Sequence, residues 1–223
     1  MRIDVVSLFP DLFEPFLRTS LVGRAAEAGV IDVGVHDLRP HGLGKHHSVD
    51  DEPYGGGAGM VMRPEPIFDA VEPLLTATSH VVLLSPKGRL LNHDVARELA
   101  THDHLVLICG RYEGVDERVA EHLCDDEISI GDYVVSGGEV AALVVVEAVS
   151  RFVPGVLGNP ESLEHESHAG GTLEYPQYTR PAVYRGLRVP DVLLSGDHGA
   201  VERWRRDEAI KTTRARRPDL SEQ

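Results

Sequence analysis

Short apolar runs that alternate with helical patterns are the feature that most constrains this chain. Five runs of β-branched and aliphatic residues predict strands: Arg2–Leu8, Val30–Val35, His80–Leu84, His104–Cys109 and Glu127–Ile130. Helical patterns separate or follow them: Leu12–Ala28, Pro64–Leu75, a helix capped by Asn92 or Asp94 that ends near Ala100, Val115–Leu123 and Glu139–Phe152. Strands that alternate with helices predict an α/β domain with a mainly parallel sheet.

Glycine-bearing loops follow the last three predicted strands. They span Ser85–Gly88, Gly110–Gly114 and Gly131–Gly138. Ligands of open parallel sheets bind outside the carboxyl ends of the strands. One glycine at a strand end is usually a plain turn, but three such loops in succession favour the walls of one small-ligand pocket.

Composition indicates a soluble globular protein. The chain has 223 residues, of which 42% are hydrophobic and 26% charged, so a disordered chain, a collagen-like fibre and a disulfide scaffold are excluded. The two cysteines, Cys109 and Cys124, lie in apolar segments and predict buried thiols. The run Val140–Val146 is far shorter than the roughly 20 residues of a spanning helix, and Arg2–Leu8 contains an acid, unlike a signal peptide. We expect a cytoplasmic protein.

Charge is distributed unevenly. The net charge is −14, yet Tyr178–Arg217 holds ten Lys and Arg against five Asp and Glu. A basic C-terminal segment on an acidic body permits a nucleic-acid partner, although a basic solvated helix face gives the same pattern. Glycines, prolines and acids without periodicity fill Gly155–Tyr178. We therefore expect an α/β domain over 1–155, a mobile linker over 156–179 and a small helical domain over 180–223.

The glycine-rich segment Gly55–Gly59 has an open interpretation. It is not a phosphate-binding Walker A loop, because Met60 and Val61 follow where Lys and Ser or Thr would stand. By itself it indicates either a tight structural turn or a close approach of the backbone to a ligand.

An ordered set of short motifs carries a family resemblance. The motifs are Tyr54–Met60, Gly110–Arg118, Ser129–Tyr133 with Gly137–Glu139, Arg151–Gly158 and Tyr178–Pro181. In this order the chain resembles the bacterial tRNA (guanine-N1)-methyltransferase family, from Arg2 to about Leu220.

The resemblance implies a fold, a cofactor and a partner. The family has an α/β domain of the SPOUT class that contains a deep trefoil knot, a linker, and a small helical C-terminal domain. It works as a homodimer with active sites shared across the interface, and transfers a methyl group from S-adenosylmethionine to N1 of guanosine 37 in tRNA. The family is generally regarded as magnesium-assisted. The residues implied to hold the cofactor, in a bent form, are Leu84, Ser85, Pro86, Gly110, Tyr112, Ile130, Gly131, Asp132, Tyr133, Val134, Val135, Gly137 and Gly138.

Chemistry and resemblance together suggest the catalytic residues. Guanine N1 carries a proton, so methylation needs a base near N1–H and a cation near O6, where negative charge develops. The family's Arg maps onto Arg151, and its Asp maps onto Glu166, a departure that keeps the carboxylate and adds a methylene. The residues implied on the tRNA side are Asp50, Ser167, Thr179 and Arg180, and arginines between Arg203 and Arg217 suit phosphate contacts.

Three rival functions share parts of this pattern. A nucleotide-binding oxidoreductase would need a dinucleotide fingerprint, which the sequence lacks. A non-catalytic RNA-binding module would explain the change at Glu166. A methyltransferase of another tRNA base would share the scaffold. Each predicts a different cofactor or product.

Overall fold

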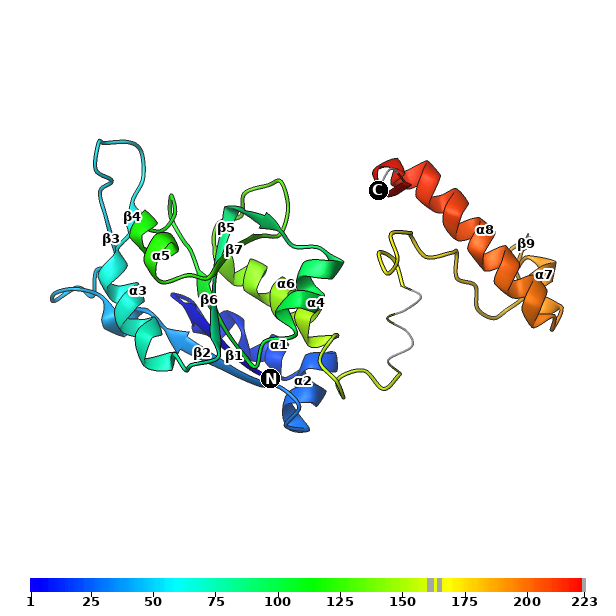
Figure 1. Cartoon of the computed structure of the whole chain (residues 1–223), viewed down its shortest axis with the longest axis horizontal. Coiled ribbons are helices and arrows are strands. Elements are labelled where there is room, and N and C mark those ends of the chain that lie inside the picture. Colours follow the sequence, from blue (N-terminus) through cyan, green and yellow to red (C-terminus); the bar gives the residue numbers. More distant parts are fainter. Residues whose placement is uncertain (160–162, 164–165, 222–223) are drawn as a thin grey trace. The chain divides into compact units, whose positions relative to one another are not determined.

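The computed structural model describes residues 1–159, 163 and 166–221. The chain divides into two units, Met1–Gly158 and Asn159–Gln223, each of which is described separately (Figure 1).

A parallel sheet of five strands organises the first unit. In the order β2-β1-β6-β5-β7, the strands are Asp32–Asp37, Arg2–Ser7, His104–Cys109, Ser79–Leu90 and Asp126–Ser129. The predicted α/β class with a mainly parallel sheet is confirmed. The helices are α1 (Glu14–Leu17), α2 (Ser20–Glu27), α3 (Pro64–Val71), α4 (His93–Leu99), α5 (Glu117–His122) and α6 (Gly138–Ser150).

Helices cover both faces of this sheet, as Figure 1 shows. On one face, α2, α4 and α6 pack against a cluster that includes Ile3, Leu105 and Leu107. On the other, α3 and α5 pack against a cluster that includes Val106 and Ile108. Because alternate residues of β6 point to opposite faces, this central strand is apolar along almost its whole length. The predicted strand had the same bounds.

The predicted helix Leu12–Ala28 is wrong as a single element. The chain instead forms a 3-10 turn (Pro10–Leu12), the short helix α1 and the separate helix α2. The hydroxyl of Thr19 donates to the carbonyl of Pro15 at 2.9 Å, and Ser20 has a φ of 59°, outside the helical region. The apolar spacing continues through the break, so periodicity alone did not reveal it.

Strand β5 is longer than predicted. The segment Ser85–Gly88, expected as a turn, is an irregularity inside the strand, because the register with β7 shifts between Leu84 and Arg89. Pro86 has no N–H for a ladder hydrogen bond. Beyond the irregularity, Arg89 and Leu90 pair again with β7, so the chain bulges outward and returns.

The segment between β2 and α3 contains little regular structure. A two-residue hairpin, β3 (Asp50–Asp51) with β4 (Val61–Met62), flanks the glycine-rich loop. Met62 of this hairpin also forms an isolated β-bridge with Val115, which follows the loop after β6. The glycine-rich loop is thereby attached beside the loop that follows β6.

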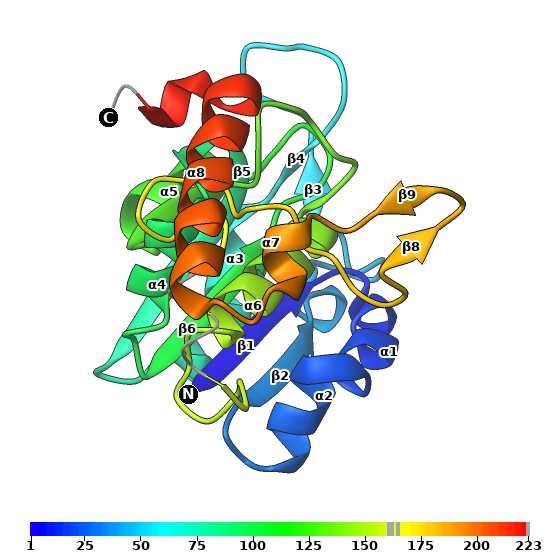
Figure 2. The ribbon, with the colours of Figure 1, turned by 90° about the vertical axis from the view of Figure 1, so that its right-hand side faces the viewer.

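The second unit contains a hairpin and two helices (Figure 2). Strands β8 (Val183–Tyr184) and β9 (Leu187–Arg188) form the hairpin, α7 spans Asp191–Leu194 and α8 spans His198–Arg216. Asp197 caps α8 by accepting a hydrogen bond from the N–H of Ala200 at 3.0 Å. Within the described ranges, no helix is long and apolar enough to cross a membrane.

A buried carboxylate joins three strands at the amino end of the sheet. Asp4 is 2% exposed and lies 2.7 Å from His36 Nε2, from His104 Nε2 and from Arg2 Nε. Ser79 extends the network, since its hydroxyl lies 2.7 Å from His104 Nδ1. The backbone passes close to the carboxylate at Gly34 in β2, where a Cβ would lie 2.5 Å from Asp4 Oδ1.

We predict that Asp4→Ala destabilises the first unit by about 3–5 kcal/mol, because removal of one partner leaves the buried histidine and the arginine uncompensated. Asp32→Ala, at an exposed position of β2, serves as the matched control and should change stability by less than about 0.5 kcal/mol. Urea unfolding measures both. Equal stabilities of the two variants would contradict the assignment.

Candidate functional site

The irregularity inside β5 and the carboxyl ends of β6 and β7 line one cavity. Its volume is about 500 Å³, within the range of small-molecule sites. Leu84 pairs with Cys109 of β6 and with Ile128 of β7, so the irregularity that follows Leu84 in β5 lies beside the carboxyl ends of β6 and β7. The pocket argued from the strand-end glycines is therefore present.

Close backbone contact holds two of the cavity loops together. The N–H of Gly138 donates to the carbonyl of Gly110 at 2.8 Å, and Arg111 forms a bridge with Gly137. A Cβ at Gly138 would lie 2.8 Å from the Cα of Cys109. Only glycine allows α6 to begin this close to the end of β6.

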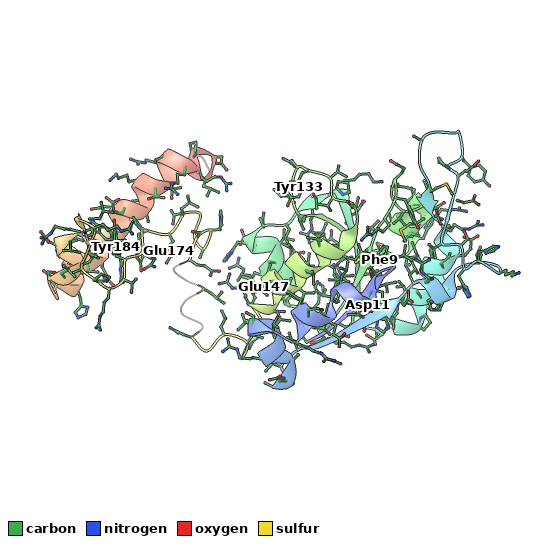
Figure 3. All side chains as sticks on the ribbon, turned by 180° about the vertical axis from the view of Figure 1, so that it is seen from behind. Phe9, Asp11, Tyr133, Glu147, Glu174 and Tyr184 are labelled. Carbon is green, nitrogen blue, oxygen red and sulfur yellow. The ribbon has the colours of Figure 1, made fainter. Side chains whose placement is uncertain are left out.

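Most predicted cofactor residues line the cavity. All of them except Gly131 and Asp132 do so. Gly131 has a φ of 153° and its backbone lies against the ring of Tyr133, so it shapes the loop from outside the cavity wall. Figure 3 shows Tyr133 on this loop, and its hydroxyl donates to the carbonyl of Ile130 at 3.3 Å.

Several polar cavity residues were missed by the cofactor prediction. They are Lys87, Arg111, Glu113, Glu117, Glu127, Ser129 and Ser136. Arg111 and Glu113 stand inside the Gly110–Gly114 motif, so their polarity beside the glycines was the available signal. The glycine-rich loop also reaches this region, because the N–H of Glu113 donates to the carbonyl of Met60 at 3.0 Å.

Two charged residues of the cavity, Lys87 and Glu117, form an ion pair, and a buried thiol, Cys109, ends the strand beside them. Lys87 Nζ donates to Glu117 at 2.7 Å, and this hydrogen bond raises the pKa of Lys87. Burial, with the nearby charge of Glu139, raises the pKa of the Cys109 thiol well above its usual value. Since the thiolate is the reactive form of cysteine, Cys109 is not a nucleophile here.

Glu127, a lining residue of the cavity, has a buried oxygen without a hydrogen-bond partner among the described residues. This atom is the carboxylate oxygen Oε1. The residues of the cavity combine such polar groups with the apolar side chains of Leu84, Ile130 and Val135. This mixture suits a ligand with an apolar part and several hydrogen-bonding groups.

The predicted catalytic residues lie in different units. Arg151 caps the C-terminus of α6 and is half-buried. Glu166 is partly buried, and its carbonyl accepts from the N–H of Ala169 at 3.1 Å. The alternative acid Glu164 and its neighbour His165 lie outside the described residues.

The residues predicted on the tRNA side occupy three local settings. Asp50 is in β3, and the hydroxyl of Ser167 accepts from the N–H of Glu174 at 3.0 Å. Thr179 and Arg180 are exposed before the hairpin of the second unit. In the parts of the chain that the structure describes, no group of three His, Cys, Asp or Glu side chains is arranged to hold a metal ion.

Helix α8 presents arginines beside aromatic rings. The Arg205 guanidinium lies 4.8 Å from the ring centre of Tyr175, and the ring centre of Trp204 lies 6.3 Å from that of Tyr178. A shallow hollow along α8 is lined by this helix alone, at Asp207, Ile210, Lys211, Arg214 and Ala215. A hollow with one wall does not enclose a small ligand.

A family model and three relatives that match this chain are described as the same kind of enzyme. The family model described as tRNA (Guanine-1)-methyltransferase TrmD matches residues 1–223. A tRNA (guanine-N(1)-)-methyltransferase of Anaeromyxobacter sp. (strain Fw109-5) is 56% identical over 226 residues, which cover 100% of this chain and 91% of the relative. Relatives of the same name from Dehalococcoides mccartyi (strain ATCC BAA-2100) and Geobacter sulfurreducens are 54% and 51% identical, over 100% and 99% of this chain and 91% of each relative.

We predict that Gly138→Ala lowers stability by about 1–3 kcal/mol, because the new methyl group forces α6 away from the end of β6. Gly158→Ala is the matched control, since nothing lies within 4 Å of the point that its Cβ would occupy and its φ is not positive. Chemical denaturation compares the two. A Gly138→Ala protein as stable as Gly158→Ala would show that the contact is not tight.

Proposed function

The chain belongs to the tRNA (guanine-1)-methyltransferase family, and from this premise we propose that it methylates N1 of guanosine 37 in tRNA. The activity on guanine N1 in tRNA follows from the family, and the methyl donor that the family implies is S-adenosylmethionine. Position 37 is the finer part of the proposal. The cavity between the irregularity of β5 and the ends of β6 and β7 supports the proposal structurally, because it coincides with the loops expected to hold the cofactor.

The cavity residues fit the methyl donor. Leu84, Ile130 and Val135 supply apolar walls for an adenine ring, and the backbone groups near Gly110 supply hydrogen bonds. The buried oxygen of Glu127 supplies an acceptor for an amino group. S-adenosylmethionine contributes a methyl group already activated by its sulfonium, so the protein has to activate only the acceptor base.

The proposed chemistry assigns one task to each of two side chains. Glu166 accepts the N1 proton of guanine as the N1–methyl bond forms. Arg151 places its cation near O6 and stabilises the negative charge that develops there. The sulfonium becomes a neutral thioether when its bond to the methyl group breaks, so charge and protons balance. Magnesium enters this proposal from the family resemblance alone.

The tRNA would be held by the second unit. Between Arg203 and Arg217, α8 carries arginines that suit phosphate contacts, which position the substrate without reading its sequence. An anticodon loop offers unpaired bases that a protein can splay and recognise. We propose the linker and domain limits given above, 156–179 and 180–223, and a cytoplasmic location, where the tRNA substrate is found.

We further propose a homodimer whose active sites are shared, with the cofactor in one subunit and Glu166 from the other. Val140 and Val144 on α6 are 55% and 41% exposed, and Val134 on the adjoining loop is 83% exposed. A second copy of the chain would cover these apolar side chains. Sedimentation of the full chain should give a dimer, and a stable monomer would contradict it.

The trefoil knot belongs to the same proposal. Two close approaches of backbone to backbone support it. A Cβ at Gly88 would meet the backbone of Glu127 in the neighbouring strand β7, and one at Gly138 would meet the end of β6. Such approaches leave room for glycine only, and a tight knot requires chain segments packed this closely.

The product of the reaction tests the function. Incubation with S-adenosylmethionine and unmodified tRNA should give N1-methylguanosine at position 37, identified by mass mapping of the nucleosides. Substitution of guanosine 37 should abolish the product. Methylation of that substituted tRNA, or a product other than the N1 isomer, would overturn the assignment. Absence of any methylation would favour the non-catalytic RNA-binding rival.

We predict that Glu166→Gln reduces the single-turnover rate by about 10²- to 10⁴-fold, the usual contribution of a positioned base. Its affinity for S-adenosylmethionine should stay close to that of the wild type. Glu164→Gln, two residues away, is the matched control and should react at nearly the wild-type rate. If Glu166→Gln retains the rate within about threefold of the wild type, the base has been misassigned.

A further inference from the structure

A second buried carboxylate lies beneath the cofactor cavity, and the chemistry proposed above does not use it. Glu139 stands in the first turn of α6 and is 1% exposed. Its Oε1 accepts from the hydroxyl of Ser7, at the end of β1, at 2.9 Å. Its Oε2 accepts from Nε of Arg111 at 2.9 Å. Both oxygens are therefore held by residues from other elements.

Arg111 links Glu139 to the wall of the cavity, because Arg111 itself lines the cavity. Its guanidinium also donates from Nη1 to the carbonyl of Ser136 at 3.3 Å, and lies 4.4 Å from the ring centre of Phe9. Figure 3 labels Phe9, which follows β1. Arg111 thus contacts the loop before α6 and the loop after β1, while its own backbone belongs to the loop after β6.

The surroundings leave the Arg111 side chain little freedom. A Cβ at Gly137 would collide with its Nε and Cδ atoms, so the bare backbone at this position makes room for it. Its backbone N–H donates to the buried sulfur of Met62 at 3.0 Å. The side chain is 22% exposed, and its pairing with Glu139 is shielded from water on most sides.

We propose that Glu139 is a positioning residue for the methyl donor, acting through Arg111 to fix the two cavity loops Gly110–Gly114 and Gly131–Gly138. This inference rests on the proposed function. Without the carboxylate, Arg111 loses the partner that orients it, and the carbonyl of Ser136 loses a donor. The two loops would then be less ordered before the cofactor binds. Part of the binding free energy would be consumed in ordering them, so the affinity for the cofactor would fall.

A purely structural role of Glu139 makes a different prediction. Loss of a purely structural Glu139 would lower the stability of the fold. The protein that remains folded would bind the cofactor with unchanged affinity. Positioning of the cavity loops affects binding of S-adenosylmethionine more than the chemical step, because the reacting groups Glu166 and Arg151 are elsewhere in the chain. The separation of binding from turnover distinguishes the two roles.

The test uses Glu139→Gln, which keeps the shape and removes the charge. We expect the dissociation constant for S-adenosylmethionine, measured by calorimetry, to rise about 10- to 100-fold, as for loss of a hydrogen bond to a charged group. The rate at saturating cofactor and tRNA should stay within about threefold of the wild type. Glu121→Gln removes the same charge from an exposed position of α5 and should leave binding unchanged.

A double variant tests whether Glu139 acts through Arg111. Arg111→Gln alone should weaken cofactor binding about as much as Glu139→Gln, and the double variant should be no weaker than Arg111→Gln, within about twofold. Multiplied effects would overturn the proposal. If Glu139→Gln does not fold, unchanged binding by folded Arg111→Gln would overturn it as well, and weakened binding with an intact rate would support it.

The wild type separates this proposal from the proposed function. If the wild-type chain binds S-adenosylmethionine and methylates tRNA while Glu139→Gln binds equally well, the positioning role alone fails. If the wild type binds no S-adenosylmethionine, the proposed function itself fails, and the positioning role fails with it.

Discussion

The structure depends on one close backbone contact, the hydrogen bond between the N–H of Gly138 and the carbonyl of Gly110. It sets the start of α6 directly against the end of β6, in a space that excludes any side chain on Gly138. The loops on either side must then face one another across the cavity. The apolar packing of α6 against the sheet holds this contact in place, since residues such as Ala142 and Val145 are fully buried.

The two buried carboxylates lie at opposite ends of the sheet, and we assign them different roles: Asp4 contributes to stability and Glu139 to the cofactor cavity. Asp4 is bound by histidines and an arginine at the amino end, away from the cavity loops. Glu139 has equivalent burial at the carboxyl end, where its partner Arg111 is part of the cavity wall. Both carboxylates are satisfied on both oxygens, as buried charges require. Their different neighbours explain why only Glu139 is assigned an influence on the cofactor.

Sequence patterns predicted the elements that depend on local properties. The strand His104–Cys109 was predicted with the observed bounds because its residues after His104 are all apolar and Gly110 ends it. The cap at Asn92, one of the two predicted, was equally local. The break before Ser20 and the irregularity after Leu84 were missed, because they arise from a side-chain bond to the backbone and from pairing with a distant strand.

The same distinction applies to the site. Glycines after three predicted strands indicated where the cavity lies, and the family resemblance supplied the predicted cofactor residues, of which Gly131 and Asp132 do not line the cavity. Arg111 and Glu139 were inside quoted motifs, but their pairing joins segments 28 positions apart and becomes visible only in the fold. The change to Glu166 was visible in the sequence, because it stands where the resemblance implies an aspartate.

Hydrogen–deuterium exchange with and without S-adenosylmethionine tests the central claim most directly, because it reports on every loop at once. We predict slower exchange on cofactor binding in Leu84–Pro86, Gly110–Gly114 and Ile130–Gly138, with NAD giving no protection. Protection confined to other segments, or equal protection by NAD, would contradict the assignment of this cavity to the methyl donor.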